Sequence, residues 1–562
     1  MERQPYYVDR KRYRRNVEKA GVMFAVYPST QNLLTAMSAR STFDRNEQHT
    51  IAVTLAPAGL QDVMTMNHNK TRPRIDRTAS AIMMERYLMR YADDPSIIGG
   101  GNADVTIYIE PDALNGATIA QAIRETGYPK IPGFYPNTGA AGIEPIIAST
   151  AEHLRPRYDI KITPSTVSEL LGNKQAFNRY QKEKFGFRVP DESSNPLETK
   201  DEISRDIDKI SYHGKRKVIV KGLKDIYGSI SYFEIAPKDF DRREKIIDKH
   251  IREKASKGVC ESTVQEYMEG TNMGAFIVTS GGKINIMYTK KTISKGPEGN
   301  RSEEVGHAYN PKDPIFQQCE EFFTPKLEDI CRDLKLDQCN GVYNADLILN
   351  EENINNSYID EINDRLGTNG APEMFTYALN QPYYAHLLRA SMGDSNAVEA
   401  MNIWKTQLKE HNAAKMELVW PNYTGPLLEQ PYPSYAYGMD SIFYISSMRE
   451  LALLEGGTRT VIVRLEEVEH DDNKGGRLTL GVYGRTMTKV NRDMAYATSS
   501  LDMLGLWDGG IVVFDGETGK LARRKVRPNS HVGKHLRDNY GCIWESREHK
   551  RGIWSKPESE KA

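Results

Sequence analysis

Three oxygen-bearing side chains fall where two consecutive strands would bring them together. The runs 342–349 and 357–363 alternate apolar and polar residues, and a turn-forming segment rich in Asn and Glu separates them. Side chains two residues apart share one face of a strand, so Glu361 and Asn363 point the same way, and a hairpin places Asp346 beside them. Magnesium prefers such hard oxygen ligands. The pattern predicts a magnesium site, with an ordinary solvent-facing strand as the alternative.

Two lysines precede these strands in the chain. Lys221 ends the apolar run 217–221, and Gly228 and Ser229 follow shortly afterwards. Small residues let a backbone approach a phosphate closely, and a lysine at a strand end neutralises phosphate charge. Lys174, in an earlier helical segment, could extend a second charge over the same cleft. Taken singly, each lysine is also consistent with ordinary exposed surface.

The segment 263–276 has the pattern of a strand, a glycine turn and a second strand. Its extended backbone beside Gln265, Glu266 and Met268 offers main-chain groups that could pair with a flat heterocycle. An ordinary hairpin is the alternative. Neither the P-loop pattern G-x-x-x-x-G-K-[ST] nor the hydrolase patterns H-E-x-x-H and G-x-S-x-G occurs. A nucleotide site in this chain would therefore be built without a P-loop.

Composition restricts the class of molecule in which these residues lie. The chain has 562 residues, 39% hydrophobic and 27% charged, and no apolar run approaches the roughly 18 residues of a membrane span. Its net charge of -1 selects neither nucleic acid nor a membrane surface as a partner. Five cysteines without a C-x-x-C pair argue against a disulfide framework or a thiolate zinc site. No secretory signal opens the sequence, so we expect a cytoplasmic protein.

The elements around the candidate residues predict an α+β fold with largely antiparallel sheets. A helix over 165–186 precedes a polar stretch, and the order strand, turn, strand, helix follows between 217 and 258. The elements expected next are strands at 263–268, 274–280 and 284–291, a long loop at 293–311 and a helix at 313–335. Together they would surround the strand pair with helices and further strands.

Changes of pattern along the chain predict three domains. Residues 1–160 alternate β-branched runs with helical patterns, as a small α/β domain does. Residues 161–415 contain the candidate residues and end in a helical stretch at about 396–416. Residues 416–562 contain recurring short strands with turns between them, which predicts a small, β-rich α+β domain.

Four segments, in this order, resemble the successive motifs of the ATP-grasp superfamily. They are NKQAFNRYQKEKFGFRVP, VIVKGLKDIYGSISYF, VQEYMEGTNMGAFIV and NADLILNEENINNSYIDEINDRLGTN, and the resemblance covers about residues 165–390. The stretch IDEINDRLG closely resembles the family's metal-binding E-x-N-x-R. The resemblance implies two α+β subdomains that clasp ATP, behind a pre-ATP-grasp-like domain. The three-part layout is weakly similar to peptide ligases of pheganomycin-type biosynthesis.

The resemblance assigns nucleotide-binding roles residue by residue. Lys174 and Lys221 match the phosphate-binding lysines, and Gly228 with Ser229 match the small loop over the phosphates. The residues that fall at the adenine hinge and the ribose are Gln265, Glu266, Met268 and Asn272. Many members use a glutamate on the ribose, where asparagine accepts a hydrogen bond but carries no charge.

The metal and catalytic roles come from the same resemblance. The oxygen-bearing residues of the strand pair match ligands for magnesium, expected as two ions with Mn2+ as a substitute. Arg365 matches an arginine that steadies the transferred phosphate or the acyl phosphate. The loop at 293–311 is placed to act as a lid, in which Arg301 and His307 could hold a substrate carboxylate or assist amine deprotonation.

The implied reaction is the formation of an amide or peptide bond. ATP and Mg2+ would activate a small carboxylic acid or amino acid as an acyl phosphate, and an amine or peptide would attack it, with release of ADP and phosphate. Two alternatives stay open. One is activation of bicarbonate as carboxyphosphate, although no biotin-carrier sequence is evident, and the other is a non-catalytic nucleotide-binding regulatory protein. A homodimer also stays open, and the sequence names neither the acid nor the amine.

Overall fold

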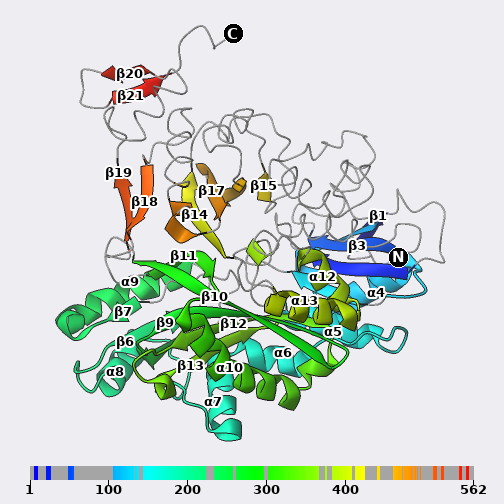
Figure 1. Ribbon diagram of the computed structural model, residues 1–562, viewed down its shortest axis with the longest axis horizontal. Coiled ribbons are helices and arrows are strands. Elements are labelled where there is room, and N and C mark those ends of the chain that lie inside the picture. Colours follow the sequence, from blue (N-terminus) through cyan, green and yellow to red (C-terminus); the bar gives the residue numbers. More distant parts are fainter. Residues whose placement is uncertain are drawn as a thin grey trace.

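The computed structural model describes most of residues 105–423 and shorter segments toward both ends of the chain (Figure 1). The described residues are 6–9, 20–26, 48–55, 105–131, 133–137, 144–222, 233–256, 261–295, 302–365, 374–375, 383–407, 412–423, 440–442, 460–470, 473–484, 486–488, 490–491, 494, 511–515, 520–524, 543–546 and 552–555. No helix within these ranges is long and apolar enough to cross a membrane.

Five strands form the N-terminal sheet, in the order β1-β4-β3-β2-β5. They are β1 (Tyr6–Asp9), β2 (Ala20–Val26), β3 (Gln48–Leu55), β4 (Val105–Ile109) and β5 (Phe134–Asn137). Every neighbouring pair is parallel except β1 with β4. Helices α4 (Gly116–Thr126) and α5 (Glu144–Leu154) share a core with the sheet. Parallel strands joined to helices agree with the α/β pattern read from this part of the sequence.

The helix expected over 165–186 is two helices in the structure. α6 (Ser165–Gly172) ends and α7 (Lys174–Phe185) begins at Asn173. The side chain of Asn173 accepts a hydrogen bond from the backbone N–H of Ala176, at 3.1 Å, and so caps α7. The prediction of one continuous helix was wrong because this cap starts a new helix. The break places Lys174 in the first turn of α7.

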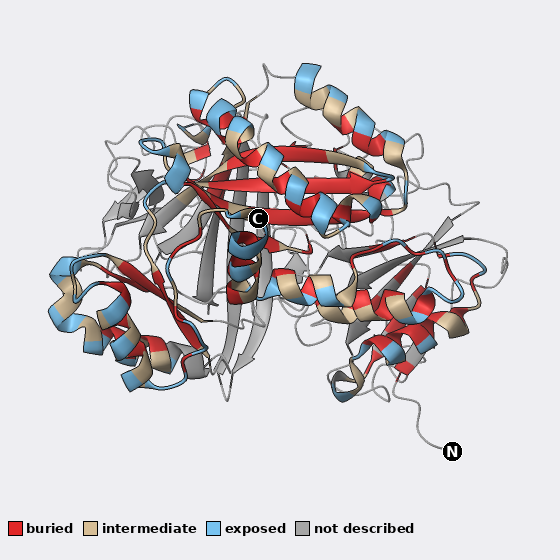
Figure 2. Ribbon diagram, turned by 90° about the horizontal axis from the view of Figure 1, so that it is seen from below, coloured by how far each residue is buried: buried red, intermediate tan, exposed pale blue. Residues whose placement is uncertain are grey.

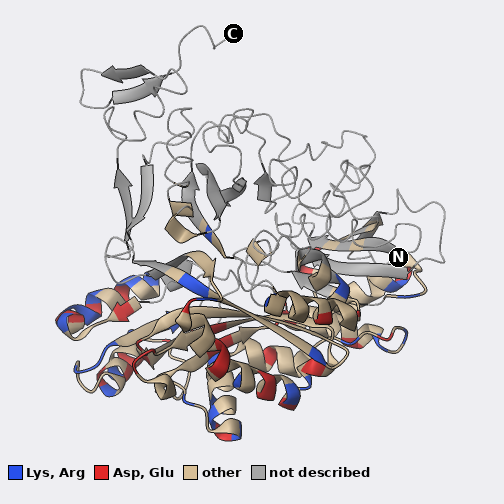
Figure 3. Ribbon diagram, in the orientation of Figure 1, with Lys and Arg blue, Asp and Glu red and all other residues tan. Residues whose placement is uncertain are grey.

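Residues 191–266 form a separate α+β unit, which we call the small lobe. Its sheet has the order β7-β6-β8, from β6 (Val218–Gly222), β7 (Phe233–Ile235) and β8 (Ser262–Glu266). Helices α8 (Lys200–Ile210) and α9 (Arg243–Ser256), with the 3-10 turn Pro237–Arg242 before α9, pack on this sheet and carry charged residues on their outer turns (Figure 3). Val218, Val220 and Val264 belong to the core of the lobe, so Ile219 and Lys221 face the other way.

Nine antiparallel strands form the large sheet, in the order β13-β12-β9-β10-β11-β14-β17-β16-β15. They are β9 (Thr271–Ser280), β10 (Lys283–Lys295), β11 (Ser302–Tyr309), β12 (Gly341–Leu349), β13 (Tyr358–Asn363), β14 (Ala413–Tyr423), β15 (Asp440–Ile442), β16 (Thr460–His470) and β17 (Asn473–Gly484). Helices α10 (Pro314–Asp333), α12 (Tyr383–Ser391) and α13 (Ser395–Gln407) pack on these strands. Figure 2 shows the buried strands beside helices whose outer sides are exposed. We call residues 271–407 the large lobe.

Two expectations about the large sheet were wrong. Much of the loop expected at 293–311 is strand, because β10 continues to Lys295 and pairs with β11 as far as Ser302. Pairing of β11 with β10 and β14 satisfies the backbone of this charged, glycine-containing stretch, which local composition does not reveal. The helix expected at about 396–416 ends at Gln407, and the next stretch is β14.

The large sheet continues past the domain boundary expected after residue 415. That boundary falls inside β14, which pairs with β11 on one side and with β17 on the other. Two hairpins lie further along the chain, β18 (Ile511–Asp515) with β19 (Lys520–Arg524) and β20 (Ile543–Ser546) with β21 (Gly552–Ser555). The remaining described elements are short 3-10 turns at Pro111–Ala113, Leu336–Gln338 and Ile354–Asn356.

Candidate functional site

The hairpin of β12 and β13 brings the predicted metal ligands together. Asp346 lies directly opposite Glu361, and Asn344 lies opposite Asn363. The Asn363 amide donates to Glu361 Oε1 at 3.0 Å, and the Asn344 amide donates to Asp346 Oδ1 at 3.2 Å. The two amides orient the two carboxylates, and the pairing expected from the sequence is confirmed.

A third carboxylate, Asp360, joins this pair through an irregularity in the hairpin. Asp346 pairs with Glu361 but Leu347 pairs with Ile359, so Asp360 is an extra residue in β13. Such a β-bulge interrupts the strict alternation of side chains and re-aims the extra residue. Both Asp360 and Glu361 contact the ammonium group of Lys174, which shows that they lie on the same side. Alternation alone would have placed Asp360 on the opposite face, and for that reason the sequence did not reveal it.

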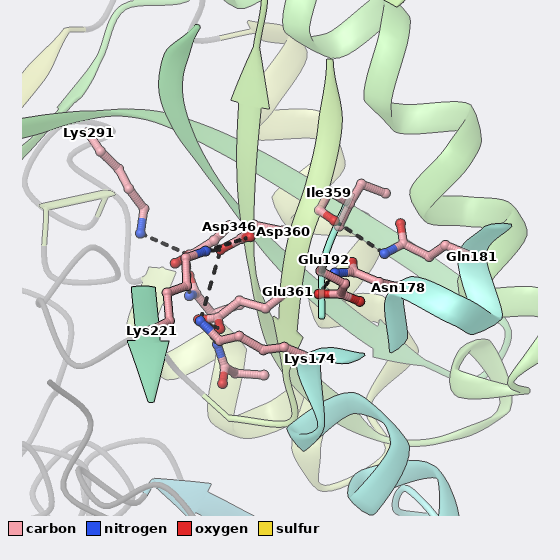
Figure 4. Close-up of polar contacts among 12 residues, drawn as sticks. Lys174, Asn178, Gln181, Glu192, Lys221, Lys291, Asp346, Ile359, Asp360 and Glu361 are labelled. Carbon is pink, nitrogen blue, oxygen red and sulfur yellow. Dashed lines mark hydrogen bonds and ion pairs between the residues drawn. The ribbon is translucent and has the colours of Figure 1, made fainter. Parts of the chain in front are cut away.

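Lys174 and Lys221 meet at these carboxylates (Figure 4). Lys174 Nζ lies 2.5 Å from Glu361 Oε2, and Lys221 Nζ lies 3.1 and 3.2 Å from the two oxygens of Asp360. Burial opposes the charge of Lys174, but Glu361 and Asp360 outweigh it, so the pKa of Lys174 is raised. Burial likewise favours protonated Glu361, but Lys174 outweighs it, so the pKa of Glu361 is lowered. The pair is therefore ionised around neutral pH.

A third lysine, Lys291 of β10, completes the charge arrangement. Its Nζ lies 2.8 Å from Asp346 Oδ1, and its side chain is 9% exposed. The Lys291 side chain passes close to Gly274 of β9. A Cβ added at Gly274 would lie 2.8 Å from Thr289 Oγ1 and 3.1 Å from Lys291 Cε. The small residue leaves room for the lysine to reach Asp346. Sequence reasoning missed Lys291 because only the pairing of β10, β9 and β12 brings it to Asp346.

Helix α7 lines the other side of the cluster with polar side chains. Lys174, Asn178 and Gln181 recur at helical spacing on one face. The Asn178 amide donates to Glu192 Oε2 at 3.1 Å, and the Gln181 amide donates to the backbone oxygen of Ile359 at 3.2 Å. Burial raises the pKa of Glu192 to about 7, so this carboxyl titrates near neutrality. The helical spacing of Lys174, Asn178 and Gln181 is the signal in the sequence that indicates this polar face.

Gln265 shares a face of the small-lobe sheet with Lys221. It pairs with Ile219 of β6 and with Glu192, and residues directly opposite one another point the same way. The Gln265 side chain is buried, and its Oε1 has no hydrogen-bond partner within the described part of the chain. A buried acceptor of this kind is available to a polar group of a ligand.

The other residues expected to contact the nucleotide are Glu266, Met268 and Asn272. Glu266 Oε2 lies 2.7 Å from the Arg188 guanidinium and accepts from the backbone N–H of Asp191 at 3.2 Å. The same guanidinium donates to the Met268 sulfur at 3.5 Å. Asn272 lies at the start of β9, opposite Ile348. The side chains of Glu266 and Met268 thus both contact Arg188.

Of the residues expected to take part in catalysis, Arg365 and His307 are buried and Arg301 lies outside the described residues. Arg365 is buried, and its Nε lies 2.6 Å from Glu144 Oε1 at the start of α5 in the N-terminal domain. His307 lies in strand β11 instead of a lid loop, opposite Lys291, and its Nδ1 lies 3.1 Å from Thr289 Oγ1. The expected residues that lie outside the described part of the chain are Gly228, Ser229 and Arg301.

The donor set on β12 and β13 fits a hard divalent cation. It consists of two carboxylates and an amide, and magnesium usually takes a few protein oxygens and keeps waters. No group of three or more His, Cys, Asp and Glu side chains within the described residues is arranged to hold a metal by itself. Water and phosphate oxygens would therefore supply the remaining ligands, as in magnesium sites that bind nucleotides.

Comparison with known proteins finds likeness in solved structures alone. No protein-family model matches the chain, and no curated protein matches its sequence. The chain is similar to L-amino acid ligase from Bacillus licheniformis, with 13% identity and a TM-score of 0.49 over 84% of this chain and 95% of that chain. It is similar to phosphoribosylglycinamide synthetase from Anaerococcus prevotii, with 14% identity and a TM-score of 0.44 over 84% and 95%. It is also similar to biotin carboxylase from Campylobacter jejuni, with 11% identity and a TM-score of 0.47 over 86% and 91%. At these values the likeness carries no argument about activity or substrate.

The chain's own layout matches the fold expected from its motifs. A small α+β lobe and a large α+β lobe lie on either side of the cluster, and Lys221 of β6 reaches across to Asp360 of β13. This is the two-lobed α+β layout that the resemblance to the ATP-grasp superfamily implied. Within it, α7 and β6 supply the lysines while β12 and β13 supply the oxygen ligands.

Proposed function

We propose that the chain is an ATP- and magnesium-dependent ligase that joins a carboxylic acid to an amine through an acyl phosphate. The observation that carries this proposal is the meeting of Lys174 and Lys221 with the carboxylates of β13. Cations from two separate elements beside a pair of hard oxygen ligands are suited to holding a polyphosphate and its metal. Glu361 and Asp346 are ordered by amides before any ligand binds.

The nucleotide lies along the face of the small lobe that carries Gln265 and Lys221. The unpartnered Oε1 of Gln265 accepts a hydrogen bond from the base, and the phosphates extend from there toward Lys221 and β13. The resemblance assigns the loop over the phosphates to Gly228 and Ser229, which lie outside the described residues. Two lysine charges then offset the charge of the phosphates.

Phosphoryl transfer in this site depends on position and charge. Asp346, Glu361 and Asn363 would hold magnesium, which would supply positive charge to offset the negative charge of the transferred phosphoryl group. Lys174 and Lys221 hold the phosphate chain in line with that acid. Arg365, oriented by Glu144, steadies the acyl phosphate until the amine attacks.

A direct test incubates the full chain with ATP, magnesium and pools of amino acids and other small acids. ADP release and new amides are measured together, the latter by mass spectrometry, with bicarbonate supplied in a parallel arm. We expect ADP release that depends on an acid, with an amide of matching mass, and no turnover when EDTA removes the metal. Absence of acid-dependent ADP release across broad pools would contradict the proposal. Release with bicarbonate and no other acid would favour carboxyphosphate chemistry instead.

A further inference from the structure

The nearest carboxylate is a different one for each of three lysines in the site, and Lys174 also lies 4.0 Å from Asp360. Lys174 lies 2.5 Å from Glu361, Lys291 lies 2.8 Å from Asp346, and Lys221 lies 3.1 Å from Asp360. Two of these carboxylates belong to the expected metal site. Asp360 does not, and it is present in the cluster because of the β-bulge in β13.

The Lys221–Asp360 pair joins the two lobes. Lys221 stands near the end of β6 in the small lobe, and both oxygens of Asp360 in the large lobe accept from its ammonium group. The two side chains are 13% and 16% exposed, so solvent screens the pair only partly. A charge-assisted contact made by both carboxylate oxygens restricts the lysine more than a single contact would.

Among the described residues, the groups around Lys221 do not offer an equivalent anchor. Glu361 already holds Lys174, and Asp346 already holds Lys291. Glu192 faces Lys221 and Asp360, but its carboxyl is held by the amide of Asn178 on α7. Without Asp360, three lysines would share two ionised carboxylates, and the ammonium group of Lys221 would have no fixed position at the junction of the lobes.

We propose that Asp360 is a positioning residue for the phosphate site, which holds Lys221 beside the carboxylates of β13 before the nucleotide binds. The proposal rests on the proposed function, because it assumes that Lys221 binds the phosphates of ATP. Asp360 touches neither the metal nor the reacting atoms in this role. It acts by presenting a lysine of the small lobe in the place where the phosphates arrive, which reduces the ordering required on binding.

The test measures ATP binding by calorimetry in the full chain, together with KM for ATP and kcat. Asp360→Asn removes the charge and keeps the shape, and we expect a Kd and a KM for ATP about tenfold higher, with a smaller change in kcat. Asp360→Glu keeps the charge, and we expect it to recover most of the affinity. Asp329→Asn is the matched control, since Asp329 is an exposed aspartate of α10 paired with Arg332.

A double variant separates positioning from a general loss of structure. If Asp360 acts through Lys221, Lys221→Met with Asp360→Asn binds ATP no more weakly than Lys221→Met alone. Unchanged ATP binding by Asp360→Asn would overturn the proposal, because the carboxylate would then make no contribution to ATP affinity. Tighter binding would also overturn it, because the carboxylate would then compete with the phosphates. An additive loss in the double variant would also overturn it.

The outcomes distinguish this proposal from the proposed function. If the wild-type chain binds ATP and forms no amide from any acid, the ligase reaction fails while the role of Asp360 is still decided by the binding data. If the wild type forms an amide and Asp360→Asn binds ATP as the wild type does, the role of Asp360 alone fails. A wild-type chain that does not bind ATP would overturn both.

Discussion

Lys174 Nζ lies 2.5 Å from Glu361 Oε2, so a lysine expected to bind phosphate neutralises a carboxylate expected to bind magnesium. Burial disfavours both charges, and each charge is retained because the other is adjacent. Binding of metal and phosphates would replace this contact with two others, Glu361 with the metal and Lys174 with the phosphates. The site is thus electrically balanced both before and after the nucleotide arrives.

Glu361→Gln is expected to lower acid-dependent ADP release by about 100-fold or more, because the variant loses a charged ligand while keeping the shape of the side chain. Circular dichroism should show an intact fold. The matched control is Glu351→Gln, at an exposed glutamate in the turn between the same two strands. Wild-type turnover by Glu361→Gln would refute the metal assignment.

The stability of the protein should depend on pH through Glu192. Burial raises the pKa of Glu192 from 4.5 to about 7, so the folded state retains a proton that the unfolded state releases between these values. The stabilising contribution of protonated Glu192 is therefore complete below about pH 4.5 and is lost as the pH rises through about 7. Urea unfolding should show wild-type stability falling relative to Glu192→Gln across this range, by up to about 3 kcal/mol. Exposed Glu198→Gln is the control, and parallel pH profiles for the wild type and Glu192→Gln would contradict the prediction.

Gly274→Val should disturb the site from the centre of the large sheet. The added Cβ would lie 3.1 Å from Lys291 Cε and 2.8 Å from Thr289 Oγ1, so both side chains must shift and the contact of Lys291 with Asp346 is disturbed. We expect a loss of about 1–3 kcal/mol in the free energy of unfolding, measured in urea, together with reduced turnover. Gly172→Ala, at a glycine with no atom within 4 Å of an added Cβ, should leave both quantities close to wild type.

The buried pair of Arg365 and Glu144 should connect the N-terminal domain to the stability of the large lobe. Arg365→Met removes the ion pair with the buried Glu144 carboxylate, and we expect the free energy of unfolding to fall by about 3 kcal/mol. The double variant with Glu144→Gln should lose less than the sum of the two single variants, because either change alone already removes the ion pair. Additive losses in urea unfolding would show that the two residues act independently.

The placement of the candidate metal ligands on their two strands was determined by the sequence alone. The alternation in 342–349 and 357–363 placed Asp346 opposite Glu361, as the register of β12 with β13 confirms. The apolar run 217–221 is likewise a strand in the structure, β6. These features follow from the two-residue period of a strand, which acts between near neighbours in the chain.

Tertiary structure decided which charged residues meet at the site. The bulge that turns Asp360 toward Lys221 interrupts the period of β13, and Lys291 reaches Asp346 only because β9 lies between their strands. Glu192 enters the site because its segment pairs with β8, and β11 is a strand because it lies between β10 and β14. Each of these outcomes depends on backbone pairing between segments, which satisfies hydrogen bonds whatever the local composition. Periodicity within one segment therefore predicted the ligands, whereas pairing between segments determined their partners.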